Sequence, residues 1–198
     1  MSRLRDAIVD AAAGRDGEDV RELVGSARTV VLVEGVSDVA ALEHLAVRRA
    51  RDLHAERVCV VPMGGATSVG RFVELLAPRG VRMAGLSDRG EWQFYVRALD
   101  RAGLGTDGFF VCDADLEHEL IRALGVAGVE RVIDDQGDLA TLRTFQRQPA
   151  QRPRSAEHQL HRWFGSIGGR KERYAGALVD ALDLDRVPRP LDDLLAYA

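Results

Sequence analysis

Acidic side chains gather where three short apolar runs of this 198-residue chain end. The acids are Glu34, Asp38, Asp88, Glu91, Asp113, Asp115, Glu117 and Glu119. Oxygen ligands in this number suit Mg²⁺ or Mn²⁺, and zinc is not expected because no histidine accompanies the main acids. Without a cation, several carboxylates about 4 Å apart could not all stay ionised. The residue types therefore predict a divalent-metal site, provided that the fold brings these acids together.

The apolar runs predict the elements that would position the acids. Continuous apolarity without alternation is typical of strands covered on both faces, as in parallel sheets. Strands are expected at 28–33, 58–61, 81–86 and 109–112. Helical spacing follows each strand, at 39–50, 68–76, 92–102 and 117–124. Four strand–helix units in a row predict an open, mainly parallel α/β sheet of about four strands flanked by helices, with the acids at its carboxyl edge.

The chain divides into three predicted parts. Residues 1–27 show helical spacing, 28–135 form the α/β core, and 136–198 form a basic, helical C-terminal appendage packed on that core. Within the appendage, helices are expected at 156–164 and 170–182.

The charge pattern suggests a phosphate-binding surface beside the metal site. The net charge of −4 argues against a protein that coats nucleic acid by charge alone. Residues 107–138 nevertheless hold nine acids against two arginines, and residues 143–173 hold eight bases against two glutamates. An acidic block followed by a basic one suits a metal centre next to a polyanion. Lys171 is the single lysine among 27 basic residues.

Several protein classes are disfavoured. No run approaches 18 apolar residues, so no membrane contact is expected, and the charged N-terminal stretch lacks the apolar segment of a signal peptide. Cys59 and Cys112 lie inside apolar runs and are expected to be buried, reduced thiols, which favours the cytoplasm. The five histidines lack zinc-like spacing; His158 and His161 share a helix face and are expected at surface or packing positions.

The order of motifs resembles the TOPRIM region of the OLD (overcoming lysogenization defect) family of ATP-dependent endonucleases. VLVEGVSDVAALE at 31–43 is similar to the first TOPRIM motif, and GLSDRGE at 85–91 stands where the family has Asp-x-Asp. Further similar stretches are VVPMGGATSVGRF at 60–72, VCDADLEHELIRALG at 111–125, GDLATLRTFQRQPAQRPR at 137–154, GRKERYA at 169–175 and VPRPLDDLLA at 187–196.

The resemblance implies a TOPRIM-type fold and DNA phosphodiester hydrolysis with two divalent cations, Mg²⁺ or Mn²⁺. By position it implies the metal ligands Glu34, Asp38, Asp88, Asp115, Glu117 and Asp113, with Ser87, Glu91 and Glu119 as further candidates beside them. It also implies catalytic roles for Glu34 and for Lys171, which matches the family's lysine near the scissile phosphate. The arginines expected to grip DNA phosphates are Arg143, Arg147, Arg152, Arg154 and Arg170.

Two departures from the family keep alternatives open. Gly90 replaces the second Asp of Asp-x-Asp, and no segment resembles the phosphate-binding loop of an ATPase. The ATPase would then be a separate chain, or the protein works without one. The alternatives are a non-catalytic TOPRIM scaffold or nucleic-acid-binding subunit, and primase- or topoisomerase-like chemistry. For strand transfer Tyr174, near Lys171, is the one tyrosine worth testing. A homodimer also stays open.

Overall fold

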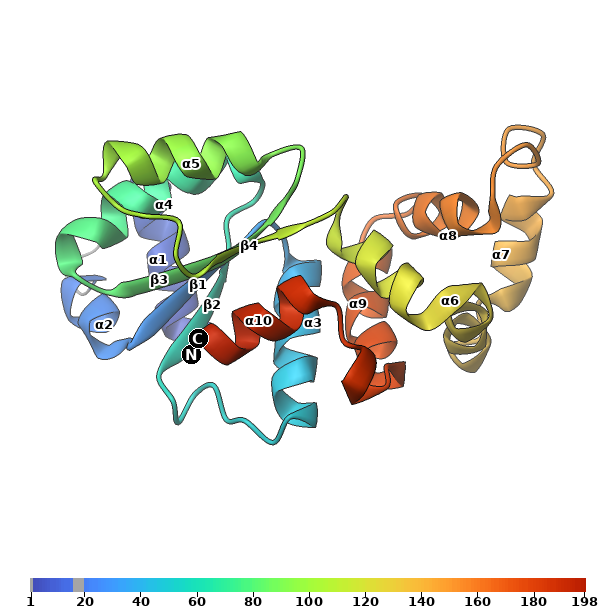
Figure 1. Ribbon diagram of the computed structural model, residues 1–198, viewed down its shortest axis with the longest axis horizontal. Helices are drawn as coiled ribbons and strands as arrows, with labels where there is room; N and C mark the ends of the chain where they lie inside the picture. Colours follow the sequence, from blue (N-terminus) through green and yellow to red (C-terminus); the bar gives the residue numbers. More distant parts are fainter. Residues whose placement is uncertain (1, 16–19) are drawn as a thin grey trace.

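The computed structural model describes residues 2–15 and 20–198 and contains a four-stranded parallel sheet (Figure 1). The strands are β1 (Thr29–Val33), β2 (Val58–Pro62), β3 (Arg82–Asp88) and β4 (Phe109–Cys112). Their order is β2-β1-β3-β4, and every pairing is parallel. The predicted α/β class is confirmed, because the four apolar runs form one sheet and all their carboxyl ends lie along a single edge.

The strands bury both faces, which explains why their sequences do not alternate. Val30 and Leu32 belong to one core cluster, whereas Val31 and Val33 belong to the other. Gly85 in β3 allows close packing, since a Cβ there would lie 2.8 Å from the Leu32 carbonyl oxygen. Both cysteines are free and buried.

Four helices cover one face of the sheet (Figure 1). They are α1 (Ser2–Ala12), α2 (Val20–Ser26), α4 (Val69–Leu76) and α5 (Trp92–Arg101). On this face Tyr95 is fully buried, and its hydroxyl donates a hydrogen bond of 2.9 Å to the Leu86 carbonyl oxygen. This bond ties α5 to β3 close to the acidic end of that strand.

The opposite face is covered by helices from both ends of the sequence (Figure 1). They are α3 (Val36–Arg48), α9 (Arg170–Ala181) and α10 (Arg189–Tyr197). Short 3₁₀ helices also occur, namely η1 (Ala66–Ser68), η2 (Ala77–Arg79) and η3 (Leu184–Arg186). Leu178 and Leu194 are buried in the same core cluster as Val31. The last 30 residues therefore complete a layer of the α/β core.

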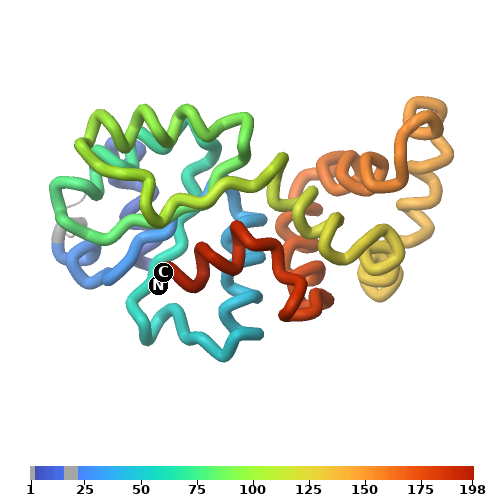
Figure 2. The backbone as a smooth tube through the Cα atoms, in the orientation of Figure 1, coloured from blue at the N-terminus to red at the C-terminus, as the bar shows by residue number. Residues whose placement is uncertain are grey.

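Three helices extend beyond the carboxyl edge of the sheet as a helical lobe (Figures 1 and 2), and their buried side chains continue the core cluster that contains Val31. They are α6 (Leu116–Asp135), α7 (Leu139–Gln146) and α8 (Ala156–Phe164). Helix α6 continues well beyond the predicted 124, with a non-helical break at Gly125, where φ is +68°. Helix α7 was not predicted from the sequence. None of the helices in the described ranges is long and apolar enough to cross a membrane.

Candidate metal site

A cavity of about 230 Å³ lies at the carboxyl edge of the sheet. Its lining residues are Glu34, Gly35, Ser37, Asp38, Gly65, Asp88, Asp115, Leu116, Glu117 and Lys171. Glu34 follows β1, Asp88 ends β3, and Asp115 precedes α6, so the parallel strands deliver acids from distant parts of the sequence. Gly65 has a φ of +116°, which favours glycine, and its N–H donates to the Glu34 carbonyl oxygen at 3.0 Å.

Glu34, Asp88 and Glu91 form the first acidic group at this edge. Each offers one carboxylate oxygen, and the three oxygens lie within 4.8 Å of one another. Glu34 Oε1 also accepts a hydrogen bond from the Asp88 N–H at 3.2 Å. Glu91 immediately precedes α5, and its carboxylate lies with those of the other two acids. A carboxylate one residue after Gly90 therefore joins the group.

The acids at this edge repel one another. Burial, then a hydrogen bond with Glu91, then the charge of Asp88 raise the pKa of Glu34 to about 8. Burial, followed by the charges of Asp115 and Asp38, raises the pKa of Asp88 to about 7. Burial also raises the pKa of Asp38 to about 6, although the Gly35 N–H, 2.8 Å from Asp38 Oδ2, partly offsets it. A divalent cation would relieve this repulsion.

Asp115, Glu117 and His161 form a second group, whose ligand atoms also lie within 4.8 Å of one another. His161 Nε2 is 2.5 Å from Asp115 Oδ2, and Asp115 Oδ1 accepts from the His118 N–H at 2.8 Å. Burial would raise the pKa of Asp115, but the hydrogen bonds from His161 and His118 outweigh it and lower that pKa. The Asp115 hydrogen bond raises the pKa of His161.

The expectation that histidine takes no part in this edge was wrong. His161 lies 46 residues after Asp115 and comes from α8, which packs along α6. Sequence spacing could not reveal this contact, because it depends on how two helices of the lobe cross. A weak signal was available, since His161 stands three residues before Phe164, whose buried side chain anchors α8.

Lys171 and Glu117 connect α9 to this second group. Lys171 Nζ lies 3.2 Å from Glu117 Oε2, and the Glu117 side chain is only 7% exposed. Among the residues that the structure describes, the other carboxylate oxygen, Oε1, is buried without a hydrogen-bond partner. Buried carboxylate oxygens are normally satisfied, so this unpaired atom is suited to bind a cation. The donor set of the cavity thus suits a divalent metal.

Three other predicted residues support the loops and do not line the cavity. Asp113 is exposed and pairs with Arg89 at 2.5 Å. Glu119 is buried, accepts from the Asp113 N–H at 2.9 Å and pairs with Arg122. Ser87 is buried, and its hydroxyl donates to the Asp88 carbonyl oxygen at 2.9 Å. Their contacts indicate that these side chains shape the turns after β3 and β4.

The predicted phosphate-binding arginines fall into two sets. Arg143 pairs with Glu130 at 2.6 Å, and the Arg170 guanidinium lies 3.9 Å from the centre of the Trp163 ring. The guanidinium groups of these two arginines therefore already contact other side chains of the lobe. The others are exposed at the end of α7 and in the connection to α8, namely Arg147, Arg152 and Arg154.

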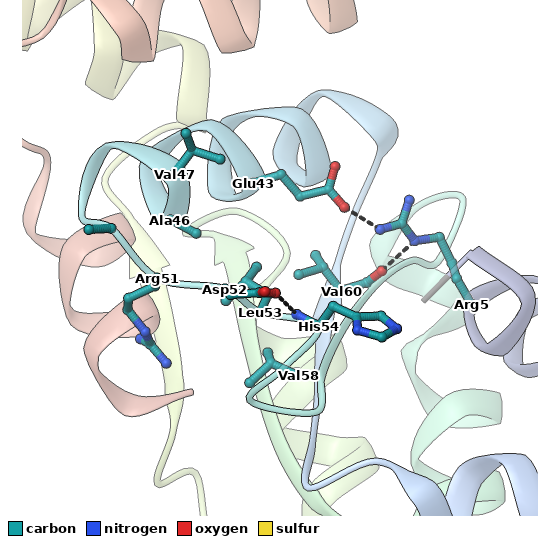
Figure 3. A pocket seen from close by; sticks show the side chains of 11 residues that line it. Arg5, Glu43, Ala46, Val47, Arg51, Asp52, Leu53, His54, Val58 and Val60 are labelled. Carbon is teal, nitrogen blue, oxygen red and sulfur yellow. Dashed lines mark hydrogen bonds and ion pairs between the residues drawn. The ribbon is translucent and has the colours of Figure 1, made fainter.

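A larger cavity of about 510 Å³ lies away from the acids, between α3 and the edge strand β2. Figure 3 shows the Arg5 side chain reaching Glu43, at 2.5 Å, and the Val60 carbonyl oxygen, at 2.7 Å. None of the predicted site residues lines this cavity. The chemistry predicted from the sequence therefore belongs to the smaller, acidic cavity.

A parallel sheet with a Glu after β1 and further acids after β3 and β4 defines a TOPRIM-type domain. The family model of the overcoming lysogenization defect protein-like TOPRIM domain matches residues 27–89, which include Glu34, Asp38 and Asp88. This match confirms the resemblance of residues 27–89 to the OLD-like TOPRIM domain. No curated protein matches the chain.

Solved structures extend the likeness beyond residue 89. The C-terminal region of the Xanthomonas campestris pv. campestris OLD protein is 26% identical, with a TM-score of 0.65; the match covers 86% of this chain and 94% of that chain. The C-terminal region of the Burkholderia pseudomallei OLD protein has the same fold, with 23% identity and a TM-score of 0.64 over 86% of this chain and 96% of that one. A match over 86% of the chain therefore reaches well beyond the residues that the family model covers.

Proposed function

We propose that this chain is a divalent-metal-dependent nuclease that hydrolyses phosphodiester bonds in DNA, using Mg²⁺ or Mn²⁺. The observation that carries this proposal is the convergence of five acids and one lysine on one small cavity. The residues are Glu34, Asp38, Asp88, Asp115, Glu117 and Lys171. Carboxylates in this density suit cations, and cations beside a lysine suit a phosphate.

The two acidic groups would hold two cations. Glu34, Asp88 and Glu91 would serve one, and Asp115 and Glu117 the other. When bound, such cations activate the attacking water and stabilise the leaving oxygen. The protein's part is to fix these ligands on the ends of β1, β3 and β4, where short turns prevent them from moving apart.

Lys171 would neutralise charge on the phosphate that enters the cavity. Its pKa is raised, since the charges of Glu117 and Asp115 outweigh the effect of burial, so the amine stays protonated. Its side chain lines the cavity and is 43% exposed. A fixed positive charge that needs no reorganisation stabilises a phosphoryl transition state effectively.

The exposed arginines of the α7–α8 connection would contact the DNA backbone. Arg147, Arg152 and Arg154 are exposed, so their guanidinium groups are accessible to phosphates. Such contacts provide affinity and orientation without base recognition. A cytoplasmic location belongs to the same proposal. The proposal is compatible with a separate ATPase chain as partner or with none, and with a monomer or a homodimer.

Plasmid nicking tests the proposal. Supercoiled DNA is incubated with the protein and Mg²⁺, Mn²⁺ or Ca²⁺, and Glu34→Gln is compared with Glu74→Gln, an exposed acid on α4. We expect nicking with Mg²⁺ or Mn²⁺ in the wild type and in Glu74→Gln, and none in Glu34→Gln. Equal nicking by all three identically purified proteins would contradict the role of Glu34.

The second candidate is a non-catalytic TOPRIM subunit that binds nucleic acid. Gly90, which removes one acid from the Asp-x-Asp position, favours it. Metal binding and DNA binding without any nicking would support this candidate. Glu91 argues against it, because its carboxylate stands within the first acidic group.

A further inference from the structure

We propose that His161 is a metal ligand, and that Asp115, Glu117 and His161 form a mixed oxygen–nitrogen site that takes a first-row transition-metal cation in preference to Mg²⁺. The inference rests on the proposed function, because it concerns the second of the two acidic groups. It goes further in naming a nitrogen ligand and the class of metal that this ligand selects.

The first argument is geometric. One ligand atom from each of the three residues lies within 4.8 Å of the other two, which is compatible with a single shared cation. His161 Nε2 is already 2.5 Å from Asp115 Oδ2, so the imidazole points at the carboxylate and not into solvent. Helix α8 is anchored by fully buried Trp163 and Phe164, which fixes the position of His161 over the start of α6.

The second argument is the unsatisfied oxygen of Glu117. Lys171 pairs with Oε2, while Oε1 is buried and lacks a hydrogen-bond partner among the described residues. A carboxylate oxygen that is held away from water and left unpaired destabilises the fold unless a ligand satisfies it. This atom belongs to a residue that lines the cavity and is part of the His161 group.

The chemistry of the donors decides the class of metal. Mg²⁺ binds oxygen ligands, keeps several waters and gains little from imidazole, whereas imidazole suits transition metals. The group of Glu34, Asp88 and Glu91 holds oxygen donors only. The two groups therefore differ in preference: the His161 group favours a first-row transition metal over Mg²⁺, whereas the oxygen-only Glu34 group accepts Mg²⁺ and Mn²⁺ alike. Mn²⁺ is the first-row metal used as the probe below.

A rival role for His161 is to orient Asp115 through their hydrogen bond without touching the metal. Pulsed EPR of the full chain loaded with Mn²⁺ separates the two roles, because an Mn²⁺-bound imidazole gives a ¹⁴N coupling that a more distant imidazole does not. We expect this coupling in the wild type, its loss in His161→Ala, and its retention in His158→Ala. His158 is an exposed histidine on the same helix and provides the matched control.

Calorimetric titration gives a second measurement. His161→Ala, which removes the nitrogen ligand, should weaken Mn²⁺ binding by at least about 10-fold. Loss of a group that only orients a metal ligand already costs about 10-fold or more, and loss of a direct ligand should cost no less. Mg²⁺ binding should change by less than about threefold, since imidazole contributes little to a hard cation. Equal loss of affinity for both metals would support the orienting role and overturn the proposal.

The outcomes distinguish this inference from the proposed function. Nicking together with Mn²⁺ binding that shows no ¹⁴N coupling would refute the His161 ligand and leave the nuclease in place. A ¹⁴N coupling without nicking would support the His161 site and refute the nuclease. Coupling lost in His118→Ala but kept in His161→Ala would also overturn the assignment, because the His118 and His161 rings are only 6.4 Å apart. If His161→Ala does not fold, the assignment is tested by the presence of the ¹⁴N coupling in the wild type and its loss in His161→Gln.

Discussion

Neutralising Glu34 should stabilise the metal-free protein at alkaline pH. Its carboxylate is half-buried next to Asp88 and Glu91, and burial above all raises its pKa to about 8. Above that pH the folded protein must carry this charge among other acids. Glu34→Gln removes the charge and keeps Oε1, which can still accept the Asp88 N–H.

The direction in which the stability of the fold changes with pH follows from how many protons the folded and unfolded states bind. The pKa of Glu34 in the folded protein, about 8, lies above the ordinary glutamate value of 4.5, so the folded state binds more protons than the unfolded state between these two values. Stability therefore falls as the pH rises from about 4.5 to about 8. The full pKa difference corresponds to at most about 5 kcal/mol. Because Glu34 is partly exposed, solvent screening reduces this to about 1–2 kcal/mol, which corresponds to a rise of about 2–8 °C in Tm for a chain of this size.

Thermal unfolding followed by circular dichroism measures this effect. With chelator at pH 8.5, Glu34→Gln should unfold at a higher temperature than the wild type, whereas Glu74→Gln should not. At pH 5 the gain should become much smaller, because wild-type Glu34 is then protonated in the folded state. Excess Mg²⁺ at pH 8.5 should raise the Tm of the wild type more than that of Glu34→Gln. A variant no more stable than the wild type at pH 8.5 without metal would refute the argument that the charged, half-buried Glu34 carboxylate destabilises the metal-free fold.

Other substitutions separate catalysis, DNA binding and loop support. Lys171→Met should slow plasmid nicking about 100-fold while metal-induced stabilisation persists; unchanged nicking would exclude an electrostatic role. Joint replacement of Arg147, Arg152 and Arg154 by alanine should lower the slope of log affinity against log salt by up to about 3, measured by fluorescence anisotropy with Ca²⁺ and a DNA duplex; an unchanged slope would place the DNA elsewhere. Asp113→Asn should leave metal affinity within about twofold in calorimetry, and a larger loss would restore Asp113 as a ligand.

The strand-end acids could be predicted from the sequence because their positions follow from local rules. A buried parallel strand is recognisable from its continuous apolar residues, and the carboxyl ends of such strands meet at one edge. Glu34, Asp88 and Asp115 therefore come together whatever the remaining helices do. Residues 27–89, which the family model matches, hold two of these three acids.

The directions of the neighbouring side chains could not be predicted in this way. Glu119 and Glu117 are two residues apart on α6, so a helix points them to different sides. Glu119 turns to the Asp113 N–H, and Glu117 turns to the cavity and Lys171. The type of residue is the same in both cases, and only the packing of α6 decides which one is a candidate ligand.

The sequence by itself determined the sheet, the edge at which chemistry is expected and the kinds of side chain available there. The tertiary structure decided that α9 and α10 belong to the core and that α8 brings His161 to Asp115. The physical reason is distance along the chain. Periodicity and turn chemistry act over a few residues. The contact between Asp115 and His161, which are 46 residues apart, depends instead on which apolar helix faces pack against each other.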